Sequence, residues 1–161
     1  MISRDLRFSA QIHGSPEMIF DLVADMPNYD RWLPDSSAFG GTVDVTPYPV
    51  RLGTTYLDAG PVLKPGSVTE FDRPRHLSFH HTVQIRQSPL NTDVDARIRY
   101  TFDPKEGGTF VDRRLVLTFN LHGISRLALP LLLYAFRKKN IRTLGACPNN
   151  AKTSCQRTKN Q

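Results

Sequence analysis

Three polar side chains stand at positions where strand alternation expects apolar ones. Apolar and polar residues alternate over 77–86, 96–103 and 111–120. The alternation places His81, Tyr100 and Arg113 among the apolar residues of the first, second and third of these strands. An unpaired buried polar group costs about 1–3 kcal/mol, and a buried charge costs more. The sequence therefore predicts that the three side chains face a cavity that holds water or a ligand.

An imidazole and a guanidinium in one cavity could perform acid-base chemistry. His81 could act as a general base on an enolisable or phenolic ligand, or it could be a core histidine bonded to a neighbouring tyrosine or to the backbone. Arg113 could stabilise an enolate or bind a carboxylate or carbonyl. The alternative for Arg113 is an ion pair with Glu70 or Asp72. Tyr100 could donate to a ligand oxygen, or simply keep its ring in the core with its hydroxyl at the edge.

Other residues are predicted to contact the ligand from the walls and the entrance of this cavity. Strand alternation supplies wall residues, the aromatic residues Tyr29, Trp32 and Tyr56 are expected at the entrance, and the predicted final helix supplies Leu131 and Tyr134. Trp32 has the alternative of anchoring the core. The predicted catalytic residues are His81 and Arg113, and the predicted ligand-binding residues are Tyr29, Trp32, Tyr56, Phe79, Ile98, Tyr100, Leu115, Leu131 and Tyr134.

The N-terminal part of the chain predicts a strand followed by two short helices. Residues 5–13 alternate as a strand that Gly14 ends. Ser15 is a favourable N-cap, and Pro16 suits the first helical position. This helix is expected to end near Asp25, and a second short helix is expected within 27–34.

The middle of the chain, 39–120, predicts antiparallel strands joined by turns. Glycine and proline residues divide it at intervals typical of a meander. The predicted turns are Gly40-Gly41, Pro47 to Pro49, Gly60-Pro61, Pro65-Gly66, Arg73-Pro74, Ser88-Pro89 and Gly107-Gly108.

After the strands, apolar residues recur at three- and four-residue intervals over 124–144. This spacing predicts a long C-terminal helix, with Pro130 either kinking it or lying in its first turn. Gly145 and Pro148 end the pattern. The remaining residues, 147–161, have few apolar side chains and are predicted to be a polar, disordered tail.

Two segments resemble a known family. SPEMIFDLVAD (15–25) with NYDRWLP (28–34) is similar to the opening helix pair of the polyketide cyclase/dehydrase branch of the START-like, birch-pollen-allergen superfamily. GSVTEFDRPRHLSF (66–79) resembles the central hairpin of that family. The resemblance extends over about 5–144. It includes no shared catalytic residue that could be carried over to this chain.

This resemblance implies an α+β helix-grip fold. In that fold a curved antiparallel sheet wraps around a long C-terminal helix, two short helices follow the first strand, and an internal pocket takes lipids, polyketides, hormones and other hydrophobic molecules. The chain departs from the family at its end, because Gly145 and Pro148 shorten the last helix. A single domain over 1–146 is expected.

The charge distribution argues against a nucleic-acid surface. The formal net charge is +6, but much of the excess lies after Phe136, and no aromatic residues interleave with these cations. The basic residues of the C-terminal part are Arg137, Lys138, Lys139, Arg142, Lys152, Arg157 and Lys159. We therefore expect a solvated basic tail and no nucleic-acid partner.

Several other classes of protein are also disfavoured. The opening residues lack the apolar segment of a secretory signal, so the cytoplasm is the expected compartment. Cys147 and Cys155 have no nearby ligand partners, and the adjacent His80 and His81 point to opposite faces of a strand, so no metal is expected. The chain has no phosphate loop, nucleophile elbow or dinucleotide fingerprint, so no cofactor is expected.

Two functions from different classes follow. The first is a cofactor-independent cyclase or dehydratase that binds a hydrophobic, polyketide-like ligand and acts by acid-base catalysis and confinement. The alternative is a non-catalytic carrier or receptor for a lipid or another hydrophobic small molecule. A third reading, a peripheral protein that uses 127–136 and 137–139 on an anionic membrane, is less favoured. The chain is expected to be a monomer or a homodimer.

Overall fold

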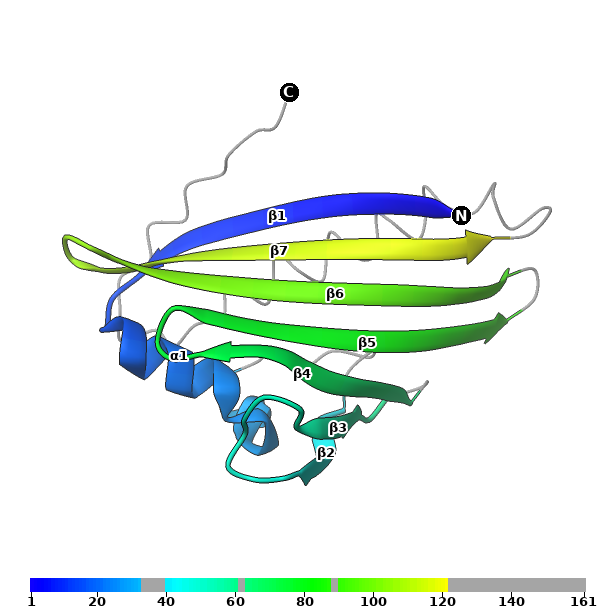
Figure 1. Cartoon of the computed structure of the whole chain (residues 1–161), viewed down its shortest axis with the longest axis horizontal. Helices are drawn as coiled ribbons and strands as arrows, with labels where there is room; N and C mark the ends of the chain where they lie inside the picture. The colour runs from blue at the N-terminus through cyan, green and yellow to red at the C-terminus, as the bar shows by residue number, and fades with distance from the viewer. Residues whose placement is uncertain (33–39, 61–62, 88–89, 122–161) are drawn as a thin grey trace.

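This computed structural model describes residues 1–32, 40–60, 63–87 and 90–121. One antiparallel sheet accounts for most of the described backbone. Its strand order is β1-β7-β6-β5-β4-β3-β2, so β2 to β7 form a meander and β1 joins it beside β7 (Figure 1). The elements are β1 (Ile2–Ile12), α1 (Pro16–Ala24), the 3-10 helix η1 (Met26–Arg31), β2 (Thr42–Thr46), β3 (Thr55–Asp58), β4 (Lys64–Asp72), β5 (His76–Gln87), β6 (Leu90–Lys105) and β7 (Gly108–Leu121).

The helix α1 begins and ends as its sequence predicts. The Ser15 hydroxyl accepts a hydrogen bond from the Met18 N–H at 3.3 Å, and Pro16 occupies the first turn, where its missing N–H costs nothing. The helix ends at Ala24, where the Asp25 N–H donates to the Asp21 carbonyl at 3.0 Å. The predicted second helix is the 3-10 segment η1. Within the described ranges no helix is long and apolar enough to cross a membrane.

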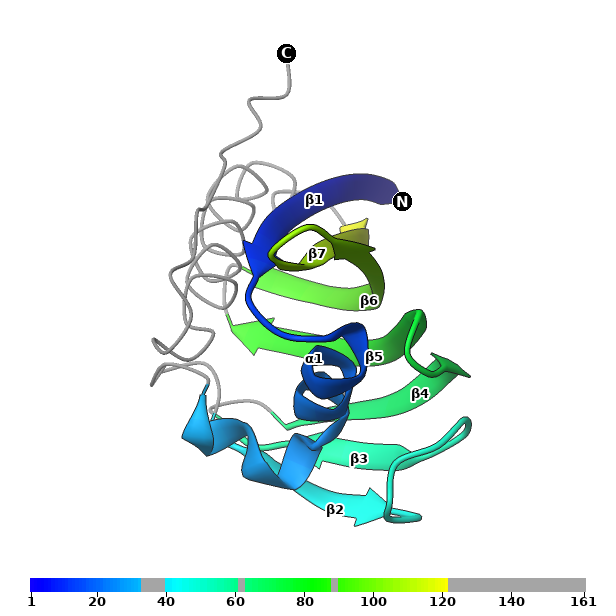
Figure 2. The ribbon, with the colours of Figure 1, turned by 90° about the vertical axis from the view of Figure 1, so that its left-hand side faces the viewer.

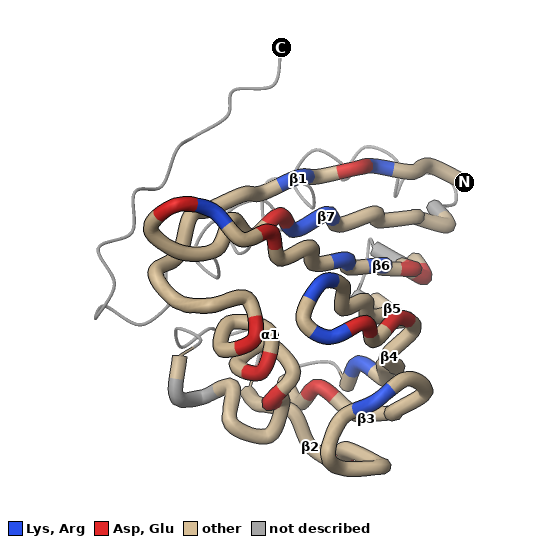
Figure 3. Tube along the Cα trace, turned by 60° about the vertical axis from the view of Figure 1, so that its left-hand side comes forward, with Lys and Arg blue, Asp and Glu red and all other residues tan. Residues whose placement is uncertain are grey.

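The sheet has a polar face and an apolar face because the strands alternate. On the polar face, Arg114 binds Asp5 at 2.6 Å and Arg99 binds Glu70 at 2.9 Å. Figure 3 shows basic and acidic residues of both signs interspersed over these strands. Figure 2 shows that the sheet is curved and that α1 and η1 lie against its concave side. The buried apolar residues of the strands lie on this side.

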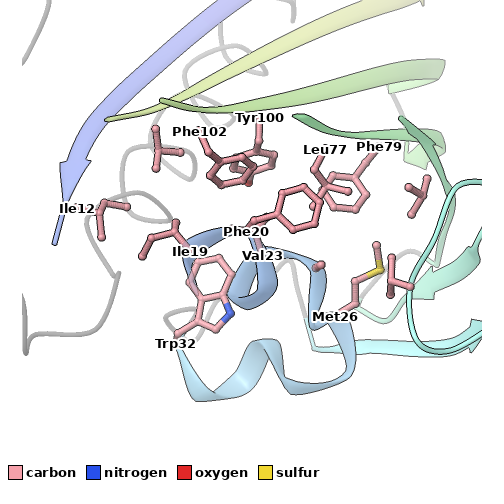
Figure 4. Close-up of a cluster of buried hydrophobic side chains, with 14 of the residues drawn as sticks. Ile12, Ile19, Phe20, Val23, Met26, Trp32, Leu77, Phe79, Tyr100 and Phe102 are labelled. Atoms are coloured by element: carbon pink, nitrogen blue, oxygen red, sulfur yellow. The ribbon is translucent and has the colours of Figure 1, made fainter. Parts of the chain in front are cut away.

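The core lies between α1 and the concave face. Phe20 of α1 is fully buried and makes edge contacts with Phe71 of β4 at 5.1 Å and Phe102 of β6 at 5.5 Å between ring centroids. The close-up in Figure 4 shows Phe20 pointing toward sheet residues that include Leu77 and Tyr100. Burying one such phenylalanine stabilises a fold by about 1.5–3 kcal/mol. This cluster fixes α1 on the sheet.

A second apolar cluster continues along the concave face of β6 and β7. Its buried members are Val94, Ala96, Leu115, Leu117 and Phe119. Ile98 packs against both clusters and joins them. The same alternation that buries the first cluster also buries the second, since these residues lie opposite one another on β6 and β7 and point to the same face of the sheet.

The predicted fold class needs correction. The described residues form one large sheet with a single α-helix and one 3-10 helix, so an α+β fold with a long C-terminal helix is wrong for them. The segment assigned to that helix, 124–144, and the predicted tail, 147–161, lie outside the described residues. The prediction rested on apolar spacing, which reports an apolar face but does not by itself establish a helix, and Pro130 lies within that run.

One predicted turn is also wrong. Pro65 and Gly66 lie inside β4, where Gly66 pairs with Tyr56 of β3 and with His81 of β5. A Cβ atom on Gly66 would lie 2.5 Å from the Tyr56 ring. This glycine therefore serves close packing within a strand rather than a turn.

Candidate functional site

Alternation correctly predicted the burial of three polar side chains. Only 11% of the His81 side chain is exposed, and Arg113 and Tyr100 are 8% and 6% exposed as whole residues. All three lie on the concave face among the apolar residues. Their role as site residues remains a prediction, and the contacts around each one indicate what it could do.

His81 is bonded to a tyrosine from two strands away. Tyr56, Gly66 and His81 lie opposite one another on β3, β4 and β5, so the tyrosine and the histidine are separated by about 9–10 Å of sheet. The Tyr56 ring crosses this distance over Gly66, and its hydroxyl lies 2.9 Å from Nε2 of His81. The contact is the tyrosine bond expected for a core histidine, and it depends on the missing side chain at Gly66.

A carboxylate faces the other ring nitrogen of His81. Asp58 lies two residues after Tyr56 on β3 and shares its face, and its Oδ2 is 3.8 Å from Nδ1 of His81. Its Oδ1 accepts a 2.8 Å hydrogen bond from the buried hydroxyl of Thr42 on β2. Lys64 stands opposite Asp58 on β4. Burial lowers the pKa of Lys64, and the Asp58 charge opposes this shift.

Tyr56 of β3 and Tyr29 of η1 keep their protons at neutral pH. Burial raises the pKa of Tyr56, and the neighbouring Asp58 and Tyr100 raise it further. Burial raises the pKa of Tyr29 well above its ordinary value. Tyr100, Tyr56 and Asp58 add to that rise, and Arg113 opposes it. Both phenols are therefore hydrogen-bond donors and not phenolates.

Arg113 lies in a different part of the concave face. Its guanidinium carbon is 5.4 Å from the centre of the Tyr100 ring, a cation–π contact between residues that are opposite each other on β7 and β6. The alternative partners expected for Arg113 were Glu70 and Asp72, and each of them binds another arginine. Glu70 binds Arg99 at 2.9 Å, and Asp72 binds a neighbouring arginine in the chain.

The structure does not bring His81 and Arg113 into contact. Arg113 shares its cross-strand row with Tyr100 and Leu77, and Leu77 is four residues before His81 on β5. Four residues of strand span about 13 Å. Phe79 connects the two ends, because its ring lies 6.1 Å from Tyr56 and 6.1 Å from Tyr100.

The remaining predicted residues are mostly part of the core. Trp32 is buried and makes an edge contact with Tyr29 at 5.4 Å, which fits the alternative of a core anchor. The Tyr29 hydroxyl donates to the Val23 carbonyl at 2.5 Å and so ties η1 to α1. Ile98 is partly buried and Leu115 is buried. The other two, Leu131 and Tyr134, lie outside the described residues.

Sequence reasoning missed the partners of His81. Tyr56 was expected at an entrance, and Thr42, Asp58 and Lys64 were not considered. The spacing of Tyr56 and Asp58, two residues apart in a strand, places both on one face and is the signal that could have found Asp58. Across the described ranges, no three His, Cys, Asp or Glu side chains lie close enough together to hold a metal ion.

The His81 imidazole lies between the Asp58 carboxylate and the Tyr56 phenol. The imidazole can take up a proton, the carboxylate can orient the imidazole and stabilise its charged form, and the phenol can donate a hydrogen bond or a proton. Phe79 contacts the Tyr56 ring, and both belong to the apolar cluster on the concave face. Such a combination of apolar walls and few polar groups is typical of small-molecule sites.

No family model matches the chain, and no curated protein matches it. Solved structures do match. The di-domain ARO/CYC BexL of the BE-7585A biosynthetic pathway has a TM-score of 0.66 at 13% identity over 93% of this chain and 50% of BexL. DynU16, from the dynemicin biosynthetic locus, gives 0.57 at 11% over 88% of this chain and 45% of DynU16.

A third similar structure is MLL2253 from Mesorhizobium loti, with a TM-score of 0.60 at 12% identity over 89% of this chain and 96% of that protein. Identities this low establish the fold and do not transfer residues. The described part of the chain thus has the sheet of a helix-grip fold.

Proposed function

We propose that this chain binds a hydrophobic, polyketide-like small molecule in an internal pocket on the concave face and promotes its cyclisation or dehydration without a cofactor. The observation that carries the proposal is the partly buried His81, which faces Tyr56 and Asp58 on the apolar side of the sheet. One of the structurally similar proteins is named as an ARO/CYC of the BE-7585A biosynthetic pathway, and another comes from the dynemicin biosynthetic locus.

The separation of the polar groups favours a long ligand. His81 and Arg113 are separated by about 13 Å along the strands in addition to their separation across the sheet. A ligand that contacts both must extend over this distance, with Phe79 and Tyr100 beneath it. An extended chain or a fused ring system of aromatic size has this length, whereas a compact metabolite does not.

The two polar ends would then have different tasks. His81 supplies the group whose protonation changes near neutral pH and so removes or returns a proton. Arg113 supplies fixed positive charge for an enolate or carbonyl oxygen at the other end. Confinement on the apolar surface holds the reacting carbons together, which replaces an encounter in solution by a unimolecular step.

Variants of these two residues test the enzyme. His81→Ala or Arg113→Ala should lower turnover about 100-fold or more, the usual scale for a general acid or base, while binding is lost to a smaller extent. Turnover is followed as loss of water or ring closure by mass spectrometry on an aromatic polyketide intermediate. His80→Ala and Arg97→Ala are matched controls on the outer face. Full activity in both inner variants would contradict the assignment.

The second candidate is a carrier or receptor, and one observation favours it. Nε2 of His81 already makes a hydrogen bond to Tyr56, as expected for a core histidine without a catalytic task. A carrier would be stabilised by its ligand without converting it. A rise in the melting temperature with apolar ligands, together with no turnover of any of them, would replace the enzyme by this function.

A further inference from the structure

Neither ring nitrogen of His81 is placed to reach a ligand directly. Nε2 is bonded to the Tyr56 hydroxyl, and Nδ1 faces the Asp58 carboxylate. The negative charge favours the tautomer with the proton on Nδ1, which leaves Nε2 as a hydrogen-bond acceptor. In that tautomer the Tyr56 hydroxyl is the donor of the 2.9 Å bond, and its oxygen keeps its lone pairs for another partner.

Asp58 is itself held in place from the neighbouring strand. Thr42 donates to its Oδ1, so that Oδ2 is the oxygen directed at the imidazole. This is the arrangement in which a carboxylate fixes the tautomer and the ring orientation of a histidine. The contact of 3.8 Å is longer than a hydrogen bond, so the carboxylate acts here through its charge.

We propose that Tyr56, His81 and Asp58 form a proton relay in which the Tyr56 hydroxyl is the catalytic group that contacts the ligand and Asp58 is a positioning residue for His81. This inference rests on the proposed function and assigns the catalytic contact to a residue that strand alternation did not single out. Its substrate class is an enolisable ketone with a hydroxyl group on the β-carbon, attached to an apolar ring system.

The relay balances in both directions. In the first step the ligand proton, from the carbon beside a carbonyl, passes to the oxygen of Tyr56 while the hydroxyl proton moves to Nε2 of His81. The ligand keeps the electron pair as an enolate, and the imidazolium is stabilised by Asp58. In the second step the enolate electron pair forms a double bond between the α- and β-carbons, the carbonyl is restored, and the bond from the β-carbon to its hydroxyl group breaks. His81 returns the proton to Tyr56, whose hydroxyl proton goes to the departing hydroxide. The ligand loses one water, and the protein is regenerated.

The tautomer of His81 is the first measurement, because it does not depend on turnover. Nitrogen-15 spectra of the histidine rings in the full chain should show His81 protonated on Nδ1 and accepting a hydrogen bond at Nε2. Asp58→Asn should move the proton toward Nε2, and Tyr56→Phe should remove the hydrogen-bond shift while retaining the tautomer. Asp95→Asn is the matched control. Asp95 lies on the outer face, and the one described histidine whose ring it contacts is His80.

The second measurement follows deuterium exchange of 2-tetralone, an apolar bicyclic ketone with an enolisable carbon, in heavy water. The wild-type protein should accelerate the exchange, and Tyr56→Phe should reduce the acceleration about 100-fold. Asp58→Asn should reduce it by about 10-fold, the lower end of the loss seen when a group that orients a functional histidine is removed. Asp95→Asn should leave the rate unchanged.

The outcomes separate the relay from the proposed function. A proton on Nε2 in the wild type, or a tautomer that ignores Asp58→Asn, overturns the relay. Acceleration that survives Tyr56→Phe also overturns the relay but leaves the proposed function standing. If the wild-type protein fails to accelerate exchange, the proposed enzymatic function is wrong. If His81 is nevertheless protonated on Nδ1, then Tyr56, His81 and Asp58 form a structural network.

Discussion

His80 and His81 are neighbours in the chain, and each faces a carboxylate, yet the two pairs lie on opposite faces of the sheet. The His80 and Asp95 side chains are 34% and 37% exposed, whereas those of His81 and Asp58 are 11% and 14% exposed. The outer pair also has Arg97 beside it, with Nε 3.4 Å from Asp95. Solvent screens the more exposed outer pair more strongly than it screens the inner pair.

This difference shows that residue type alone does not mark a site. Both pairs have the imidazole and the carboxylate that acid-base chemistry needs. Only the inner pair has a phenol on the second ring nitrogen and aromatic side chains around it. Electrostatic interactions strengthen where water is excluded, so the inner pair is the one that could control the protonation of a ligand.

The largest expected effect separates the two faces of β5. Leu77→Ala on the inner face removes a fully buried side chain and should lower the free energy of unfolding by about 2–5 kcal/mol. Ser78→Ala on the outer face removes a 2.6 Å hydrogen bond to Glu70 and should cost about 1 kcal/mol or less. Urea unfolding of both variants checks this difference. Equal losses would show that the two faces do not differ in packing.

The next effect concerns the path of Tyr56 to His81. A Cβ at position 66 would lie 2.5 Å from the Tyr56 ring, so Gly66→Ala should displace the ring, break the 2.9 Å contact and cost about 1–3 kcal/mol in the free energy of unfolding. Thermal unfolding and the His81 ring spectrum report the two consequences. Gly40→Ala is the control, because a Cβ there meets nothing closer than 3.6 Å. An unchanged His81 spectrum in the Gly66 variant would contradict the geometry.

Position 66 also shows where sequence reasoning reaches its limit. Alternation within a strand is local, and it correctly assigned His81, Tyr100 and Arg113 to the buried face. The capping residues of α1 are equally local and were equally predictable. Gly66 resembles a turn residue in sequence, and only the register of three strands shows that it makes room for the Tyr56 ring.

The side-chain contacts that the sequence did not predict depend on how the strands pair. The two-residue spacing from Tyr56 indicates which face Asp58 lies on, but only the register of β3, β4 and β5 brings it beside His81. The same applies to Arg113, which lies a long way from His81 although both are inward. The predicted fold class is wrong for a different reason. Apolar spacing over 124–144 predicts a long helix, whereas the described residues form one sheet with a single α-helix and one 3-10 helix.

The smallest expected effect lies entirely on the outer face, at two aspartates whose pKa values move in opposite directions. Hydrogen bonding to Arg114 lowers the pKa of Asp5, whereas burial raises the pKa of Asp112. A lowered folded pKa means that Asp5 stabilises the fold above its unfolded pKa near 3.9, and that this contribution is lost as the pH falls through the folded value. A raised folded pKa means that ionised Asp112 opposes folding at neutral pH, and that this penalty disappears in acid.

Asp5→Asn should therefore destabilise the protein at pH 7, and Asp112→Asn should stabilise it. Both differences from the wild type should shrink by pH 2, where the carboxyls are protonated in the folded and unfolded states alike. Urea unfolding at the two pH values measures them, and each should be smaller than the loss in Ser78→Ala because water and salt screen exposed charges. If both variants shift stability in the same direction at pH 7, burial and pairing do not act on the two carboxyls as their surroundings indicate. The outer face would then have to be treated as one coupled network of charges, and His80 with Asp95 would no longer be a neutral control for the inner pair.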